Sequence, residues 1–254
     1  MRAGGTSTEW LAFVENDVML DDGWLDTLLD RAEATGADVV YPAYLQDTAT
    51  GPKVHGLGAE IELTGAAGAR RIGELQHELG RPWAEVAPTV DEADRPQSEP
   101  HCFVMRRALY DDLGGLDEEL LGWFDHVDLG LHVLELGVRS RMVPTVTCTY
   151  VPPPPLARVD WRSFATRWGR PWYDASRARL CATWGLDPNA PGWAPHANYR
   201  HFVRASVPTR SRRVNRVLAR VTAPLEVVSR RGWALRGDRL RGGGLHCIPH
   251  NRRS

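Results

Sequence analysis

The hydrophobic pattern in the first part of the chain alternates between short apolar runs and amphipathic stretches. Trp10–Val14 is a short apolar run bounded by polar residues, which predicts a strand buried on both faces of a sheet. The next stretch predicts an amphipathic helix that ends at Gly36, because apolar residues recur at helical spacing: Leu25, Leu28, Leu29 and Ala32. Asp38–Pro42 then predicts a strand closed by its proline. Strand, helix and strand in this order form the unit of a parallel sheet.

The middle of the chain has a looser pattern before a second strand and helix. Alternating residues near Ala59–Leu63 predict one arm of a hairpin. Gly80–Pro100 holds four prolines and many charges, which predicts a mobile surface loop. His101–Met105 is a second apolar run and predicts a buried strand, followed by a short helix over Ala108–Leu113. Gly114 and the glycine after it end this helix.

A third helix is predicted to begin at Asp125, whose carboxylate suits the N-cap position. Gly137 ends this helix, and its apolar stripe consists of Val127, Leu131, Leu134 and Leu136. Arg141–Val151 predicts a last strand, which the polyproline segment Pro152–Pro155 stops. The pattern therefore predicts an α/β fold in which helices flank a sheet.

Composition places the chain among soluble globular proteins. Its 254 residues are 43% apolar and 25% charged, and the net charge of -1 gives no global signal for nucleic acid or for a membrane. The four cysteines are Cys102, Cys148, Cys181 and Cys247. They lie far apart and form no CxxC pair, which argues against a zinc site or a disulfide framework and fits a reducing cytoplasm. No apolar stretch approaches the roughly 20 residues needed to cross a bilayer, so we expect a cytoplasmic protein.

The composition changes along the chain and suggests three parts. Residues 1–155 carry the α/β pattern, residues 156–200 form an aromatic-rich helical extension, and residues 201–254 are rich in arginine. This last part allows a basic amphipathic helix that contacts the inner face of a membrane peripherally, or an ordinary solvated helix with a disordered tail. It contains no recognised nucleic-acid-binding module, so we expect no nucleic-acid partner.

Acidic groups follow the first apolar run directly. Glu15, Asn16 and Asp17 leave the predicted strand at its carboxyl end, where open α/β sheets place their ligands. Two carboxylates one residue apart can hold a hard divalent cation such as Mg²⁺ or Mn²⁺ and leave positions free for phosphate oxygens. The alternative is a solvated acidic turn before a helix.

A second concentration of titratable groups lies at the start of the third predicted helix. Asp125, His126 and Asp128 stand within four residues, which is more than a helix cap requires. A general base facing a cleft needs such a group. A structural cap is the alternative for Asp125, because a helix N-terminus stabilises a carboxylate.

Together, the two acidic stretches resemble the inverting glycosyltransferases of family 2, which have the GT-A fold. Phe13–Val18 and Gly23–Leu25 are similar to the family's strand that ends in an acidic triplet and is followed by a Gly-Trp and a helix. Further segments resemble the acceptor-side strand, the Gly-Gly-Phe-Asp-Glu turn and the Glu-Asp-x-Asp-Leu helix start of that family: His101–Arg107, Gly114–Glu118 and Asp125–Leu129. The resemblance covers about residues 9 to 190. It implies a partial GT-A (Rossmann-like) mixed sheet flanked by helices, with an Arg-rich C-terminal helical extension.

The resemblance also implies an activity. The chain would transfer a sugar from a nucleotide-sugar donor to a hydroxyl of a saccharide or lipid-linked acceptor, with inversion. Asp17 would be the stronger ligand of a Mn²⁺ or Mg²⁺ ion, with Glu15 standing where aspartate is more usual, and the ion would neutralise the leaving diphosphate. Asp125 would be the general base. The residues placed at donor-binding or acceptor-binding positions are Asn16, Trp24, His101 and Trp123.

The chain departs from the family pattern at two positions of the site. His126 stands where the family has a second carboxylate, so the base could be Asp125 or His126, with Asp128 as a partner at the helix start. Tyr150 ends the last strand, where many relatives bring a histidine toward the metal. Thr149–Pro154 followed by Arg167 and a tryptophan is similar to one bacterial subgroup, which implies a bacterial enzyme of cell-envelope polysaccharide.

The start of the chain also departs from that pattern. Family members begin with further β/α units that hold the nucleotide, and this sequence has no counterpart of them. The strand at Trp10 would then have an unpaired edge. We therefore expect a chain that lacks the N-terminal nucleotide-binding part. The alternative to an enzyme is a catalytically inactive remnant that acts as a binding or regulatory module.

Overall fold

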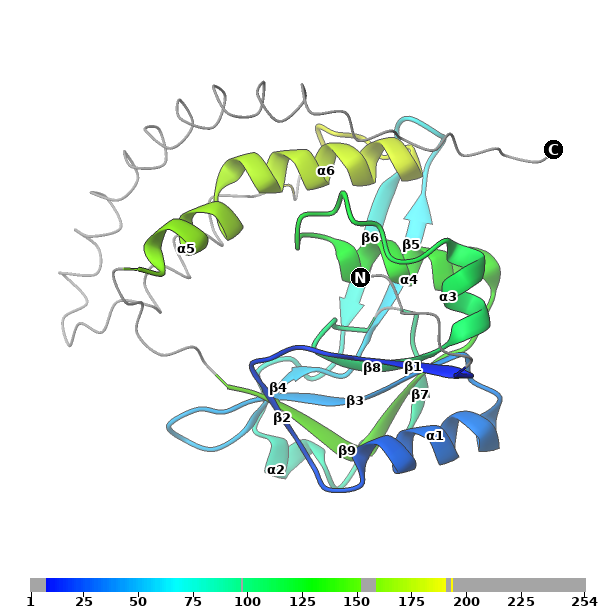
Figure 1. Ribbon diagram of the computed structural model, residues 1–254, viewed down its shortest axis with the longest axis vertical. Helices are drawn as coiled ribbons and strands as arrows, with labels where there is room; N and C mark the ends of the chain where they lie inside the picture. The colour runs from blue at the N-terminus through cyan, green and yellow to red at the C-terminus, as the bar shows by residue number, and fades with distance from the viewer. Residues whose placement is uncertain (1–7, 97, 152–158, 191–192, 194–254) are drawn as a thin grey trace. The chain divides into compact units, whose positions relative to one another are not determined.

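The computed structural model describes residues 8–96, 98–151, 159–190 and 193 (Figure 1). The chain divides into two compact units, 1–154 with 172–194, and 155–171 with 195–254. Of the second unit, the described residues include helix α5 (Trp161–Arg167). The polyproline segment and the Arg-rich end, for which the sequence made predictions, lie outside the described residues. Both acidic stretches belong to the first unit.

A seven-stranded sheet is the centre of the first unit. Its strands are β1 (Trp10–Val14), β2 (Val18–Leu20), β3 (Val39–Gln46), β4 (Lys53–Gly56), β7 (Ala93–Asp94), β8 (Cys102–Arg106) and β9 (Ser140–Tyr150). The order is β1-β8-β3-β9-β2, with β4 paired to β3 and β7 paired to β9. Strands β3 and β9 are parallel, and the other pairs are antiparallel. The predicted hairpin is confirmed as β5 (Ala59–Thr64) with β6 (Arg71–Gln76).

Helices lie against the sheet and the hairpin: α1 (Trp24–Thr35), α2 (Trp83–Val86), α3 (Arg107–Leu113), α4 (Asp125–Leu136) and α6 (Arg170–Trp184). Helix α1 buries Leu28 against one face of the sheet, in a cluster with Val40 of β3. Neighbouring residues of a strand point to opposite faces, and Val39 accordingly packs in a different cluster with Leu129 and Val133 of α4. Helices therefore cover both faces, and the prediction of a mixed α/β sheet flanked by helices is confirmed.

Strand β1 has the predicted bounds but not the predicted burial. It pairs with β8, and among the described strands it is the last on its side of the sheet. Its side chains are only partly buried or exposed, and 46% of Val14 is accessible to solvent. The prediction of a strand buried on both faces is therefore wrong, because β8 lies between β1 and β3 and moves β1 to the edge. An unpaired edge at Trp10 was expected from the sequence, and this placement agrees with that expectation.

Strand β3 continues past the residue that was expected to end it. Pro42 lies inside the strand, where the register with β9 shifts between Pro42 and Ala43. Pro42 is opposite Val143 and Ala43 is opposite Thr147, so β9 bulges there, and a proline without an N–H group is tolerated at such an irregularity. The segment Gly80–Pro100 is likewise more regular than predicted, since it contains α2 and β7.

Helix α4 ends before Gly137 as predicted, but its N-cap and its buried face differ from the prediction. Phe124 occupies the cap position, and its carbonyl oxygen accepts a hydrogen bond from the Asp128 N–H at 2.9 Å, so Asp125 is the first helical residue and not the N-cap. Leu134 and Leu136 are 43% and 52% exposed, so the prediction that they belong to the buried apolar stripe is wrong. The first half of the helix is instead buried on two sides, because it packs between the sheet core and a second core that α6 helps to form.

No helix in the described part of the chain has both the length and the apolar character that a bilayer crossing requires.

Candidate functional site

The two strands at the edge of the sheet bring the first acidic stretch next to a histidine. Val14 at the end of β1 is paired with Cys102 at the start of β8, and the Glu15 N–H donates to the His101 carbonyl oxygen at 2.9 Å. Glu15, Asp17 and His101 each offer a ligand atom, and these three atoms lie within 4.8 Å of one another. The predicted metal pair is thus joined by His101, which the resemblance had placed among the substrate-binding residues.

The arrangement leaves one oxygen of this group without a hydrogen-bond donor. The backbone oxygen of Asp17 accepts from the Val151 N–H at 2.9 Å, which ties the turn after β1 to the end of β9. The imidazole Nδ1 of His101 contacts the Glu15 carboxylate. The Oδ1 atom of Asp17 is buried, and no residue that the structure describes donates a hydrogen bond to it. A buried carboxylate oxygen without a partner is costly, and a cation is one group that would satisfy it.

The electrostatics of this group depend on what surrounds it. Burial, and then the charge of Glu15, raise the pKa of Asp17, while His101 acts in the opposite direction. For His101, burial is the largest effect and disfavours the charged form, but the hydrogen bond and charge of Glu15, with the charges of Glu99 and Asp17, together outweigh it and raise the pKa. Carboxylates that repel one another in this way favour either a proton or a metal ion between them.

A layer of aromatic rings packs against His101. The His101 ring centroid is 5.1 Å from that of His55 and 5.3 Å from that of Tyr150, and the last two are 5.8 Å apart. Burial and the charge of His101 lower the pKa of His55. Tyr150 ends β9, as expected, so the last strand brings a tyrosine side chain to this group and not a histidine. Sequence reasoning missed His55, because it lies on a short strand distant from both acidic stretches.

Glu99 is a further carboxylate that the sequence did not single out. A Cβ atom placed on Gly56 would stand 3.3 Å from Glu99 Cγ, so this side chain packs beside the strand that carries His55. The Tyr44 hydroxyl donates to the carbonyl oxygens of Glu99 and Cys102, at 2.9 and 2.7 Å, which holds the chain on both sides of His101. The charge of Glu99 acts on His55, His101 and His126.

The second acidic stretch forms a pair at the start of α4. The His126 N–H donates to Asp125 Oδ1 at 3.0 Å, and the His126 Nδ1 atom lies 3.3 Å from the same oxygen. Burial opposes a charge on His126, but Asp125 and then the negative charges of Glu99 and Glu74 raise its pKa to about 9. His126 is therefore a cation at neutral pH. Since Glu99 acts on both His101 and His126, it electrostatically links this pair with the Glu15, Asp17 and His101 group.

Other residues of the predicted site lie elsewhere. Asp128 is 6% exposed, and its carboxylate accepts a hydrogen bond from Trp184 Nε1. Trp123 is buried, with its ring 5.2 Å from that of Tyr173. Trp24 packs into the apolar cores on α1, and Asn16 is exposed in the turn between the two carboxylates. Of the nine predicted residues, the structure joins Glu15, Asp17 and His101 in one group and Asp125 and His126 in a second.

Comparisons with known proteins give one sequence relative of limited extent. The chain is 28% identical over 149 residues to the O-antigen biosynthesis protein RfbC of Myxococcus xanthus, a match that covers 56% of this chain. The chain spans about a tenth of the length of that curated relative, since the match covers 10% of it. No protein-family model matches.

A solved structure of GalNAc-T7 with UDP, GalNAc and Mn²⁺ aligns with 76% of this chain and 38% of its own, at 12% identity and a TM-score of 0.40. Part of this chain is similar to a segment of a protein named for O-antigen biosynthesis.

Proposed function

We propose that this chain is a glycosyltransferase with the GT-A fold. It would transfer a sugar, with inversion, from a nucleotide-sugar donor to a hydroxyl of a saccharide or lipid-linked acceptor. The observation that carries the proposal is the convergence of Glu15, Asp17 and His101 at the end of β1. The order of motifs along the sequence supports the reaction class, and the name of the Myxococcus xanthus relative supports a role in bacterial cell-envelope polysaccharide.

The residues of the first group suit a divalent cation. Their ligand atoms lie within 4.8 Å of one another, the donor set is two carboxylates and an imidazole, and Asp17 Oδ1 has no hydrogen-bond donor among the described residues. Mn²⁺ or Mg²⁺ would fit the oxygen ligands. When bound, the ion would neutralise the diphosphate of the departing nucleotide. The charged groups that act on His101 are carboxylates, so a diphosphate would be repelled from this edge of the sheet without such an ion.

Asp125 is the better candidate for the general base. The pKa of His126 is about 9, so at neutral pH this imidazole already holds its proton and cannot accept another. Its backbone N–H donates to Asp125 Oδ1, which fixes the orientation of the carboxylate. Asp125 would take the proton of the acceptor hydroxyl, and the oxygen would attack the anomeric carbon from the side opposite the nucleotide. A single displacement of this kind inverts the configuration.

Binding of nucleotides tests the donor half of the proposal. Titration calorimetry of the 254-residue chain with UDP, GDP and dTDP, with and without Mn²⁺, should show binding that requires the ion. Asp17→Ala should remove the ion-dependent part, while Asp22→Ala, a nearby exposed carboxylate, should keep it. A folded chain that binds no nucleotide under either condition would favour the alternative, an inactive remnant that acts as a binding or regulatory module.

Substitution of the second group tests the assignment of the base. Asp125→Asn should lower sugar transfer from a panel of UDP-, GDP- and dTDP-sugars by about 10²–10⁴-fold, because an amide cannot accept the proton. His126→Gln should cost less, since it removes a partner of the base and not the base itself. Normal turnover in Asp125→Asn would exclude this residue as the base.

A further inference from the structure

Asp128 lies in the first turns of α4 and points to α6. Its Oδ1 atom accepts a hydrogen bond from Trp184 Nε1 at 2.7 Å, and this contact is buried. Its Oδ2 atom lies 3.7 Å from His132 Nε2, one helical turn further along. The His132 ring meets the Trp184 indole edge to face, with centroids 4.8 Å apart. The carboxylate is thus enclosed between one helix and the end of another.

A carboxylate in this place has a cost that the fold must offset. Asp128 is only 6% exposed, and burial raises its pKa, while the hydrogen bond from Trp184 acts in the opposite direction. An unpaired buried acceptor costs about 1–3 kcal/mol, and more when it carries a charge. An apolar residue at position 128 would leave the buried Trp184 N–H without an acceptor, so the carboxylate and the indole depend on each other.

Helix α6 also holds the chain that leads into α4. The Leu121 N–H donates to Ser176 Oγ at 3.0 Å, and Ser176 is fully buried. The rings of Trp123 and Phe124 contact Tyr173, at 5.2 and 5.3 Å between centroids. In the sequence, residues that contact α6 therefore both precede and follow Asp125 and His126. Asp128, inside α4, is among those that follow them.

The backbone between these contacts is in an unfavourable conformation. Phe124 has a φ of +66°, in the left-handed region, which costs a residue with a Cβ atom about 1–2 kcal/mol. Such a conformation persists where the surroundings fix it from both sides. It turns the chain immediately before Asp125, so the direction of the Asp125–His126 pair depends on it.

We propose that Asp128 is a positioning residue: as a hydrogen-bond acceptor for Trp184 it fastens the start of α4 to α6 and thereby holds the Asp125–His126 pair. Its role requires an acceptor oxygen and no exchange of protons with a substrate. The proposal rests on the proposed function only in that Asp125 is the base; the fastening itself is independent of the reaction.

The test uses the titration of His126, followed by NMR of its imidazole. The charged groups that face His126 are Asp125, Glu99 and Glu74, so its titration reports their placement. Asp128→Ala and Trp184→Phe should each lower the pKa of His126 from about 9 by about one unit or more, because the pair moves relative to Glu99 and Glu74. Asp128→Asn keeps an oxygen that can accept from the indole, so it should leave the titration close to that of the wild type.

Two controls separate positioning from loss of structure. Trp172→Phe makes the same substitution in α6, away from Asp128, and should leave His126 unchanged. The resonances of His77, which contacts Glu60 on the hairpin, report the fold outside α4 and should not move in any variant. If one of the two variants unfolds, the other decides the test, because each removes one partner of the same hydrogen bond.

The outcomes are distinct. An unchanged His126 titration in folded Asp128→Ala and Trp184→Phe would overturn the proposal. A shift in Asp128→Asn as large as in Asp128→Ala would also overturn it, since the charge and not the acceptor would then matter. If Asp125→Asn keeps full turnover while the His126 titrations behave as expected, the proposed base fails and the fastening of α4 stands.

Discussion

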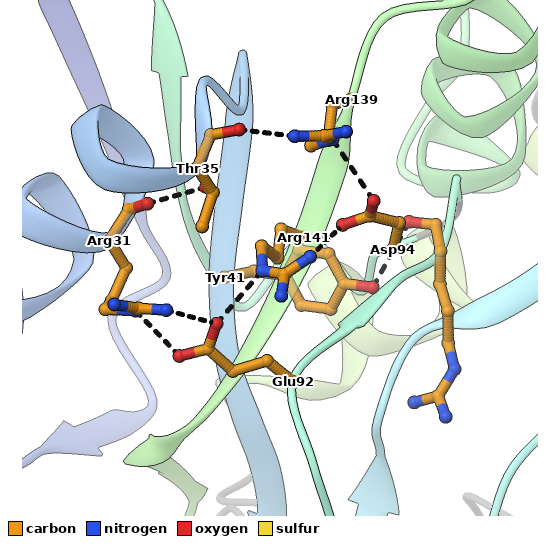
Figure 2. Close-up of polar contacts among 8 residues, drawn as sticks. Arg31, Thr35, Tyr41, Glu92, Asp94, Arg139 and Arg141 are labelled. Atoms are coloured by element: carbon orange, nitrogen blue, oxygen red, sulfur yellow. Dashed lines mark hydrogen bonds and ion pairs between the residues drawn. The ribbon is translucent and has the colours of Figure 1, made fainter.

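The carboxylates at the two ends of strand β9 have opposite surroundings. Near its start, Glu92 accepts two hydrogen bonds from Arg31, at 2.7 and 2.8 Å, and one from Arg141 at 3.0 Å (Figure 2). Arg141 also donates to Asp94 at 2.6 Å, and Arg139 lies 3.1 Å from the other oxygen of Asp94. The hydrogen bond from Arg31 lowers the pKa of Glu92 despite a partial burial. We name this set the arginine network.

The carboxylates near the end of β9 lack such partners. Glu15 and Asp17 face each other and His101, and the pKa of Asp17 is raised, first by burial and then by Glu15. One end of the sheet thus satisfies its carboxylates with guanidinium groups of the same chain. The other leaves a carboxylate oxygen that no described residue satisfies. The arginine network thus stabilises the fold with groups of the chain itself, whereas the unsatisfied oxygen supports the proposal that the Glu15, Asp17 and His101 group binds a cation from outside the chain.

Removing Asp17 should give the largest effect. Asp17→Ala should weaken Mn²⁺ binding by about 100-fold or more, because it removes a ligand that the remaining two cannot replace. The stability of the cation-free chain should not fall, since the substitution removes a partly buried carboxylate and its like-charge contact with Glu15. Calorimetric titration with Mn²⁺ and urea unfolding measure the two quantities. A clear loss of stability with normal Mn²⁺ binding would assign Asp17 to the fold.

Exchanging the imidazole should change the choice of metal. Imidazole suits transition metals, while Mg²⁺ prefers oxygen ligands. His101→Gln should therefore weaken Mn²⁺ binding by about tenfold and affect Mg²⁺ less, because the amide still offers an oxygen. His77→Gln, on the hairpin, is the matched control and should change neither affinity. Equal losses for both ions would show that the His101 imidazole does not select between Mn²⁺ and Mg²⁺.

Substitution in the arginine network should lower stability and leave Mn²⁺ affinity unchanged, the reverse of what we expect for Asp17→Ala. Glu92→Gln should lower the free energy of unfolding by about 1 kcal/mol, since Arg31 and Arg141 lose their shared carboxylate. Mn²⁺ affinity at the other end of the sheet should remain unchanged. Glu33→Gln, at an exposed position of α1 outside the contacts drawn in Figure 2, is the control for urea unfolding. A loss of Mn²⁺ affinity in Glu92→Gln would mean that the two ends are not independent.

Hydrophobic periodicity predicted where several helices and strands lie in the sequence, but it did not predict which strands pair in the sheet. The bounds of β1, the end of α1 at Gly36 and one arm of the hairpin follow from local spacing. The placement of β1 at the edge could not be read from Trp10–Val14, because an edge strand and a central strand can share one apolar run. The strand order is set by which segments pair across long separations, and nothing local in the sequence encodes that β8 enters between β1 and β3.

The candidate site was predictable where its residues are close in sequence. Glu15 and Asp17, and likewise Asp125 and His126, each stand within one short stretch. His101 joined the first group only because β8 runs antiparallel to β1, which brings the start of one strand to the end of the other. His55 and Glu99 arrive from a short strand and from the segment that was expected to be a loop, so no spacing pointed to them.

The smallest expected effect is the acid response of the arginine network. The folded chain holds the pKa of Glu92 below its ordinary value of 4.5, so the unfolded chain binds a proton there first as the pH falls. The stability that Glu92 contributes is therefore complete above the unfolded pKa and is lost as the pH falls through the lower, folded pKa. The difference in unfolding free energy between the wild type and Glu92→Gln should be constant from about pH 7 to 5.5 and shrink below about pH 4.5. Urea unfolding of both proteins across this range measures it, and a difference that persists undiminished down to about pH 3 would mean that the carboxylate charge contributes nothing and that the shape of the side chain alone matters.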